Sequence, residues 1–146
     1  MASSPLLPAV LASEPFSVSV VLFSQPACEF CEEARVHYLL PLIASGRSHV
    51  FVGEVRLDGR RIVAGAGSDS VSEADFARRH DVRFAPTLLF LGARGGELAP
   101  RIVGLSRDYF GAYLDARLAT ALLAADPAHP DATTASPPRA SARTVP

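Results

Sequence analysis

The feature that most constrains the fold is a junction between an apolar run and a helix-forming segment, which holds both cysteines of the chain. The β-branched and large side chains of residues 20–23 predict a buried strand, and Pro26 ends it. Cys28 then falls at the first turn of a helix, where unpaired N–H groups and the helix dipole favour thiolate over thiol. Cys31 follows one helical turn later, so the pair can close a small disulfide and reopen it.

A cysteine pair at this spacing has two other interpretations, a zinc site and a pair of buried residues. A tetrahedral zinc site needs four ligands, but the chain has no third cysteine, and His37, His49 and His80 lack ligand spacing. We therefore predict no metal site. The cysteines could also be two small buried hydrophobic residues. The strand–turn–helix context favours a redox motif over that interpretation.

Length and charge limit the class of protein. The chain has 146 residues, 49% of them hydrophobic and 20% charged, as expected for one soluble globular domain. A net charge of −1 gives no reason to expect a nucleic acid or an anionic membrane as partner. No apolar run approaches the roughly 20 residues that span a bilayer, and we expect a monomer. No positive residue precedes the short apolar patch at residues 6–12, so no secretory signal is predicted.

Hydrophobic periodicity and turn residues divide the chain into a loose N-terminal segment (1–15), a folded domain (16–124) and a disordered tail rich in proline and alanine (125–146). Within the domain we expect strands at 16–23, 49–58, 87–91 and 97–103, the last two joined by a glycine-rich hairpin. The first helix should run over 28–40 and end or kink at Pro41. A loop at 60–70 precedes a second helix, which a capping box at 70–73 begins, and Ser106 should cap the last helix.

The predicted order of strands and helices resembles that of the thioredoxin-like superfamily. Three segments carry the resemblance: Cys28-Glu29-Phe30-Cys31, residues 82–90 and residues 103–106. The resemblance covers residues 16–123 and implies an α/β fold with a central mixed sheet of about four strands and helices on both faces. The late Pro41 and the long loop before the second helix resemble exported bacterial (SoxW-type) thioredoxin-like proteins. That likeness favours a periplasmic location, whereas the N-terminus as it stands favours the cytoplasm.

The resemblance also implies the roles of the site residues. Cys28 would be the nucleophile, Cys31 the resolving thiol, and Pro86 a cis proline facing the pair; otherwise Pro86 merely begins an edge strand. An apolar surface for protein substrates would be formed by Ala27, Phe30, Phe84, Ala85 and Gly104, with the backbone of Ala85 pairing with an extended substrate segment. Apart from the redox-active disulfide, no cofactor is expected.

The chain departs from the family at two positions. Leu22 stands where thioredoxins have a buried aspartate that takes the proton of the second cysteine, and Ala27 stands where they have a tryptophan. Glu54 falls about where the family has a lysine. We hypothesise that Glu54 is a partly buried carboxylate with a raised pKa that accepts the proton of Cys31. Alternatively, Glu54 faces solvent or pairs with Arg56 or Arg83.

These features predict a thiol–disulfide oxidoreductase in cell redox homeostasis, which acts on protein disulfides and takes electrons from an upstream donor. Glu29, Glu32 and Glu33 suit a helix N-terminus, but their charge opposes a nearby thiolate. A reducing or intermediate potential is therefore expected. The alternative is a redox-inactive docking module with vestigial cysteines, because folds are reused without their chemistry.

Overall fold

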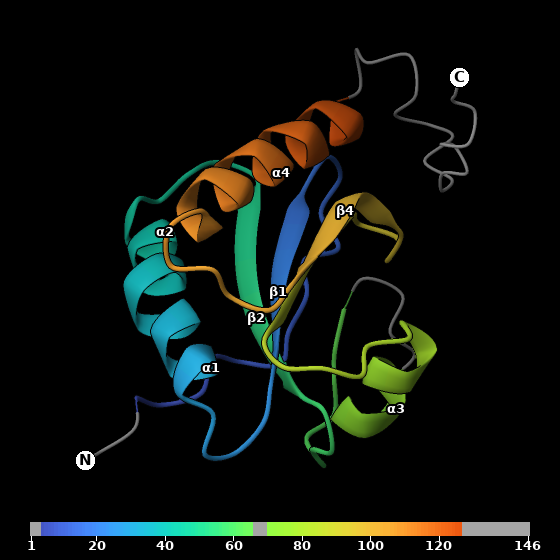
Figure 1. The fold of residues 1–146 in the computed structure, drawn as a ribbon. Helices are drawn as coiled ribbons and strands as arrows, with labels where there is room; N and C mark the ends of the chain where they lie inside the picture. Colours follow the sequence, from blue (N-terminus) through green and yellow to red (C-terminus); the bar gives the residue numbers. More distant parts are fainter. Residues whose placement is uncertain (1–3, 66–69, 127–146) are drawn as a thin grey trace, which may run out of the picture.

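The computed structural model describes residues 4–65 and 70–126. Figure 1 shows the elements in the order β1 (Val18–Ser24), α1 (Glu29–Glu33), η1 (Ala34–Leu39), α2 (Leu40–Ala44), β2 (Val50–Arg56), α3 (Glu73–Arg79), β3 (Thr87–Leu91), β4 (Glu97–Val103) and α4 (Phe110–Ala125). The element η1 is a π-helix that joins α1 to α2. No helix in this described part is long and apolar enough to cross a membrane.

The four strands form one mixed sheet in the order β2-β1-β3-β4. Strand β1 is parallel to β2 and antiparallel to β3, and β4 is antiparallel to β3. Every residue of β1 is buried, as the apolar run predicts. The ends of β1, β2 and β4 meet the start of β3 at one end of the sheet. Ser24 of β1 pairs with Arg56 of β2, and Thr87 of β3 pairs with Phe23 of β1 and Val103 of β4.

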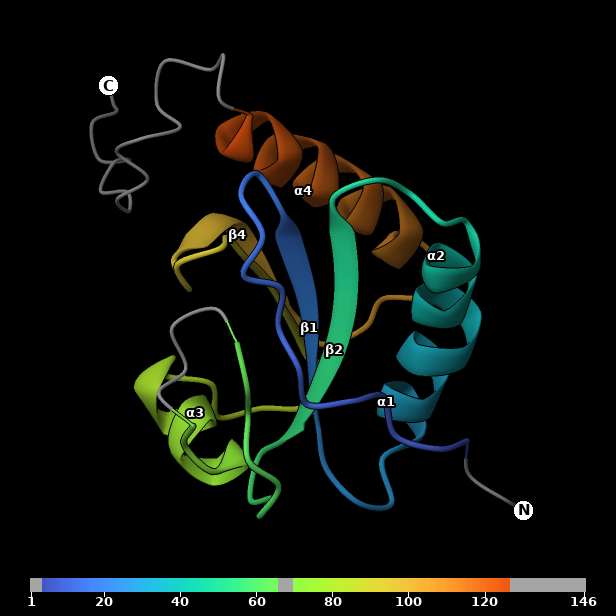
Figure 2. The same ribbon diagram turned by 180° about the vertical axis from the view of Figure 1, so that it is seen from behind.

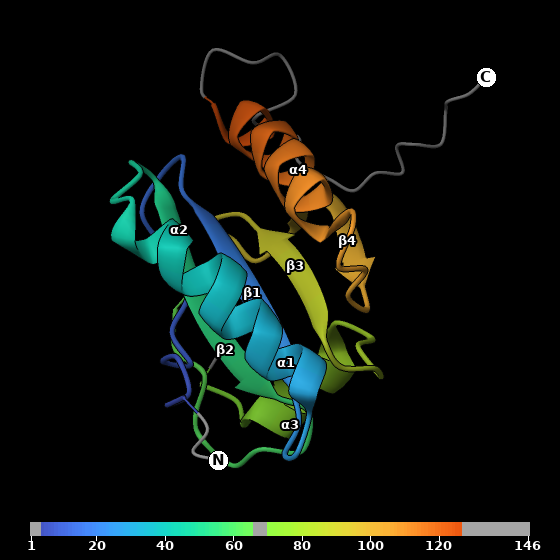
Figure 3. The ribbon, with the colours of Figure 1, turned by 60° about the vertical axis from the view of Figure 1, so that its left-hand side comes forward.

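Alternate residues of the central strands point to two separate hydrophobic cores. Val20 and Leu22 of β1 belong to the core beneath η1 and α4, whereas Val21 and Phe23 belong to the core beneath α3. Helices α1, α2 and α4 lie on the same side of the sheet in Figure 3, and the rings of Tyr38 and Phe110 pack edge to face between η1 and α4. The predicted fold class, a mixed sheet with helices on both faces, is confirmed.

The sequence predicted that the first helix ends or kinks at Pro41, and the structure contradicts the first of these two outcomes. The backbone N–H of Leu40 bonds to the carbonyl of Arg35, five residues earlier, and α2 continues to Ala44. Proline removes a donor and its ring collides with the carbonyl four residues before it. The wider π turn directly before Pro41 changes that spacing, and the helix therefore continues past the proline.

The N-terminal segment is not loose over residues 4–12, which corrects the prediction for 1–15. Figure 2 shows this segment crossing the lower end of β2 and then running along β1. Its carbonyl at Pro8 accepts the backbone N–H of Glu54 at 2.9 Å, and the side chains of Leu7 and Leu11 are buried. Gly53 permits this approach, because a Cβ there would lie 2.6 Å from the carbonyl oxygen of Val10. Such contacts are tertiary and leave no periodic pattern in the sequence.

Two helix starts also differ from the prediction. Ser72, and not Ser70, caps α3, since its Oγ accepts the backbone N–H of Asp75 at 3.1 Å. Ser106 lies in a turn before α4, where its backbone carbonyl accepts the N–H of Phe110 at 2.7 Å. Helix α4 ends at Ala125. From residue 127 on, the predicted tail at 125–146 lies outside the described residues.

Candidate active site

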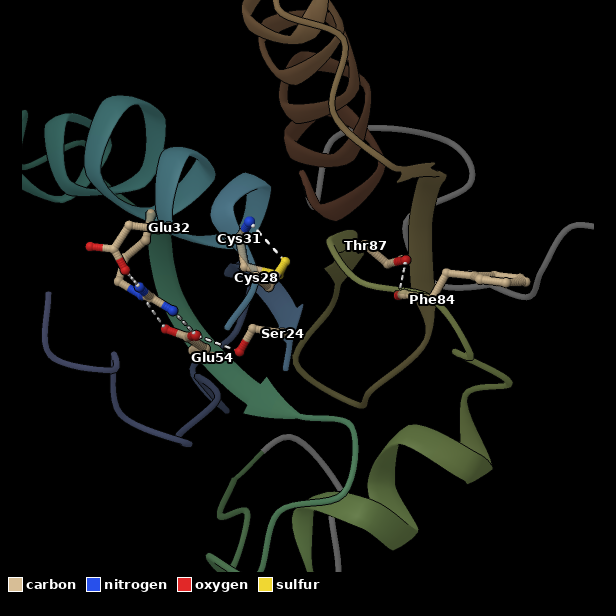
Figure 4. Close-up of a disulfide and its surroundings, with 8 residues drawn as sticks. Ser24, Cys28, Cys31, Glu32, Glu54, Phe84 and Thr87 are labelled. Atoms are coloured by element: carbon tan, nitrogen blue, oxygen red, sulfur yellow. Dashed lines mark hydrogen bonds and ion pairs between the residues drawn. A yellow bond between two sulfur atoms is a disulfide. The ribbon is translucent and has the colours of Figure 1, made fainter. Parts of the chain in front are cut away.

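Cys28 and Cys31 form a disulfide at the start of α1 (Figure 4). Cys28 is the N-cap residue with extended backbone, and its Sγ accepts the backbone N–H of Cys31 at 3.1 Å. Its side chain is half-buried, whereas Cys31 is only 1% exposed. The two sulfurs are therefore unequal: one reaches the surface and accepts a helix N–H, and the other faces the core.

The start of β3 lies next to the end of β1, from which the chain runs four residues to Cys28. The peptide bond between Ala85 and Pro86 is cis, which is the geometry that the resemblance implies. The carbonyl of Pro86 accepts the N–H of Gly104 at 2.7 Å. This bond ties the residue after β4 to the same end of the sheet.

The residues expected to form the substrate surface are at least partly exposed. Phe84 is 70% exposed and Phe30 is 46% exposed, which are high values for phenylalanine. Ala27 is exposed, and both Ala85 and Gly104 are partly exposed. Exposed aromatic side chains of this size are suited to contact with another protein chain.

A charged side chain that the sequence analysis did not single out lies against this surface. The Arg107 guanidinium lies over the Phe30 ring, with its Cζ 5.6 Å from the ring centroid. Its Nε also donates to Glu33 Oε1 at 3.0 Å, and Glu33 raises the pKa of Arg107. Arg107 therefore compensates one of the three carboxylates that follow Cys28.

Glu54 is fully buried and does not pair with either of the arginines considered from the sequence. It binds Arg35, with Nε 2.8 Å from Oε1 and Nη2 2.5 Å from Oε2. Ser24 Oγ donates to Oε2 at 2.6 Å, and the Leu7 N–H donates to Oε1 at 3.0 Å. Figure 4 shows the Ser24–Glu54 bond on the strands next to the disulfide.

The hypothesis of a raised pKa for Glu54 is therefore wrong. Burial alone would raise that pKa, but the hydrogen bonds from Arg35, Ser24 and Leu7 and the charge of Arg35 outweigh it. The pKa lies below its ordinary value, and both oxygens are occupied. A carboxylate held in this way is a poor acceptor for the proton of Cys31.

Arg35 and Ser24 were missed in the sequence, although Arg35 carried a usable signal. It stands four residues after Cys31, and residues at that spacing share one face of a helix. Because Cys31 is buried, Arg35 had to be buried with it and to find a carboxylate. Nothing in the local pattern of β2 identified Glu54 as that partner.

Fold and disulfide together define a thioredoxin-fold protein with a CxxC pair. Neither a protein-family model nor a curated protein matches the sequence. Among solved structures, the chain is similar to a thioredoxin-fold protein from Helicobacter pylori, characterised structurally and functionally. The two share 15% identity with a TM-score of 0.52, over 80% of this chain and 85% of that one. At this identity the likeness shows the fold alone.

In the parts of the chain that the structure describes, no three histidine, cysteine or acidic side chains gather as a metal site.

Proposed function

We propose that the protein is a thiol–disulfide oxidoreductase. The observation that carries the proposal is the asymmetric disulfide: a half-exposed Cys28 at a helix N-cap and a buried Cys31. In the reduced protein, the Cys28 thiolate attacks a substrate disulfide, which forms a mixed disulfide and releases one substrate thiolate. Cys31 then attacks Cys28 Sγ, releases the second substrate thiolate and restores the Cys28–Cys31 disulfide. A dithiol donor returns the two electrons.

Protein disulfides are the substrate class that the surface supports. Phe30, between the two cysteines in the sequence, and Phe84, two residues before Pro86, both offer exposed apolar area. The partly exposed backbone at Ala85, with Pro86 in the cis form, offers polar groups to which an extended segment could add as a strand. Ala27 and Gly104 leave this surface free of bulky side chains.

The charges near Cys28 support a reducing or intermediate potential. The backbone N–H of Ser4 bonds to Glu32 and lowers its pKa, so Glu32 stays ionised one residue after Cys31. Arg35 pairs with Glu32 at 2.7 Å and Arg107 pairs with Glu33, so these carboxylates oppose a Cys28 thiolate only in part. Strong oxidants depend on a very stable thiolate, which this mixture of charges does not favour. We expect a potential well below the strong-oxidant value of about −120 mV. Equilibration of the pair with glutathione buffers, followed by alkylation and mass measurement, tests this value.

As a finer proposal, the long segment between β2 and α3 supports a place among exported thioredoxin-like proteins of the SoxW type.

Reduction of insulin by dithiothreitol, followed as turbidity, tests the proposed activity. Wild-type protein should accelerate the reaction, and Cys28→Ser should not. Cys31→Ser should instead accumulate a mixed disulfide through Cys28, visible by mass spectrometry. Ser45→Ala, at the exposed end of α2, is the control that should keep wild-type activity. Equal turbidity curves for wild type and Cys28→Ser would refute the proposal.

One observation favours the second candidate, a docking module without redox activity. Leu22, which pairs with Glu54 in the sheet, has no ionisable group, and Arg35 holds Glu54 ionised. Neither residue therefore offers a carboxyl group that could take the proton of Cys31. A docking module would show the same partner binding for wild type and Cys28→Ser, and neither protein would reduce insulin.

A further inference from the structure

A buried charge cluster lies behind the disulfide and has no part in the proposed exchange so far. Glu54 is 0% exposed and Arg35 is 3% exposed. Taking such a pair out of water costs several kcal/mol per ion, and only good geometry and further hydrogen bonds repay it. Arg35 stands on the helix that carries Cys31, and Glu54 stands on β2. The pair therefore joins the resolving cysteine's helix to the sheet.

All acceptor positions of the Glu54 carboxylate are occupied. Oε1 accepts from Leu7 N and Arg35 Nε, and Oε2 accepts from Ser24 Oγ and Arg35 Nη2. An ionised carboxylate has about four lone-pair sites, and these donors fill them. A proton could join this carboxylate only if one donor left, and a buried donor without a partner is costly.

The charged and polar groups around Glu54 come from each element packed against it. Besides Ser24 on β1 and Leu7 in the N-terminal segment, these are Arg35 on η1, Glu32 on α1 and Arg61 after β2. Glu32 shares Arg35, with Oε1 2.7 Å from Nη1, and the Arg61 side chain donates to the Glu54 backbone carbonyl at 3.0 Å. Arg61 is itself paired with Glu73 of α3 at 2.8 Å. The cluster thus holds two carboxylates around Arg35, and Arg61 is compensated by its own partner.

We propose that Arg35 is a positioning residue for the exchange reaction, which holds Glu54 permanently as a carboxylate and so removes the buried acid from proton transfer. This inference rests on the proposed function. The proton of Cys31 then passes to the substrate thiolate that leaves, rather than to a side chain of the protein. Exchange should accordingly follow the ionisation of the thiols, without a second ionisation from a buried acid.

Carbon-13 NMR of the Glu54 side-chain carboxyl tests the first half of the proposal in unaltered protein. In both the oxidised and the reduced wild type, the resonance should not shift between pH 5 and 9. A titration of Glu54 within that range would overturn the proposal. The measurement needs no activity, so it stands even if wild type fails to reduce insulin, a result that would count against the proposed function alone.

Variants test the positioning role. Arg35→Met removes two of the donors and leaves Glu54 buried, so burial should raise the pKa of its carboxyl into a range above the ordinary one for glutamate. The pH profile of the rate of insulin reduction should then gain an inflection in that range. Arg35→Met with Glu54→Gln is the matched control and should lose the inflection. Arg35→Lys keeps the charge and should restore the wild-type profile shape.

A rate profile for Arg35→Met with the wild-type shape, in folded protein, would overturn the positioning role. If Arg35→Met does not fold, Glu54→Gln replaces it. Loss of a permanent charge can shift the thiol inflection of its rate profile, but the number of inflections should stay that of wild type. A Glu54→Gln profile with one inflection fewer than wild type would show that Glu54 titrates in wild type and would also overturn the proposal.

Discussion

Replacement of Gly53 by alanine should release the N-terminal segment from β2. The added Cβ would lie 2.6 Å from the Val10 carbonyl oxygen and 3.2 Å from that of Pro8. Both neighbours are backbone atoms, so the segment itself has to move. Overpacking of this kind costs about 1–3 kcal/mol, and the loss of the Glu54–Pro8 hydrogen bond adds about 0.5–1.5 kcal/mol.

An opposing effect has to be subtracted. Alanine restricts the unfolded chain more than glycine does, which stabilises a protein by about 0.4–1 kcal/mol where the site tolerates it. The steric cost and the lost hydrogen bond together exceed this gain, so Gly53→Ala should lower the free energy of unfolding by about 0.5–4 kcal/mol. Gly111→Ala is the control, because its Cβ would meet only Tyr38, at 3.5 Å, within a helix. That variant should be more stable by about 0.5–1 kcal/mol.

Urea unfolding of the two variants measures both effects. At an ordinary slope, Gly53→Ala should lower the midpoint by roughly 0.5–2 M, and Gly111→Ala should raise it. Hydrogen exchange at the Glu54 amide should become faster in Gly53→Ala only. A Gly53→Ala protein as stable as wild type, with the Glu54 amide equally protected, would refute the reasoning.

Three further outcomes are expected. Glu73→Gln should lower the free energy of unfolding by about 1–3 kcal/mol in urea, because the buried carboxylate binds a partly exposed Arg61; equal stability would argue against this pair. Burial lowers the pKa of His80, so the unfolded chain, in which this histidine has a pKa near 6.5, binds more protons than the folded protein. The contribution of His80 to stability should be full above that pH and decline below it. In urea unfolding, His80→Gln should reduce the fall of the midpoint between pH 7.5 and 5.5. Phe84→Ala should change stability by less than about 0.5 kcal/mol yet slow insulin reduction severalfold, while the rate with a small aromatic disulfide stays near that of wild type.

Strands β3 and β4 show what local sequence can predict. Their observed bounds, Thr87–Leu91 and Glu97–Val103, agree with the prediction because Pro86 and the glycine-rich hairpin mark the ends directly. The CxxC pair and its place at a helix start were equally visible, since they depend on residues close together in the chain.

Contacts between distant segments were not predictable in this way. Glu54 and Arg35 are 19 residues apart, and their pairing depends on how the helix lies over β2. The docking of residues 4–12 depends on Gly53 and on buried polar groups of β2, and their own composition indicates a loose segment. The sequence therefore identified the cysteine pair and its place at a helix start, and the charges behind the pair required the three-dimensional structure.

The N-terminal segment also limits how copies of this protein could associate through their sheets. The backbone N–H of Glu54 is used by Pro8, and that of Arg56 is used by the Glu73 carboxylate at 2.9 Å. The Glu54–Arg56 end of the β2 border is therefore already bonded within the molecule. Unpaired N–H and C=O groups along an edge strand are the template to which another chain adds. This end of β2 should consequently not accept a strand from another molecule for as long as the N-terminal segment stays in place.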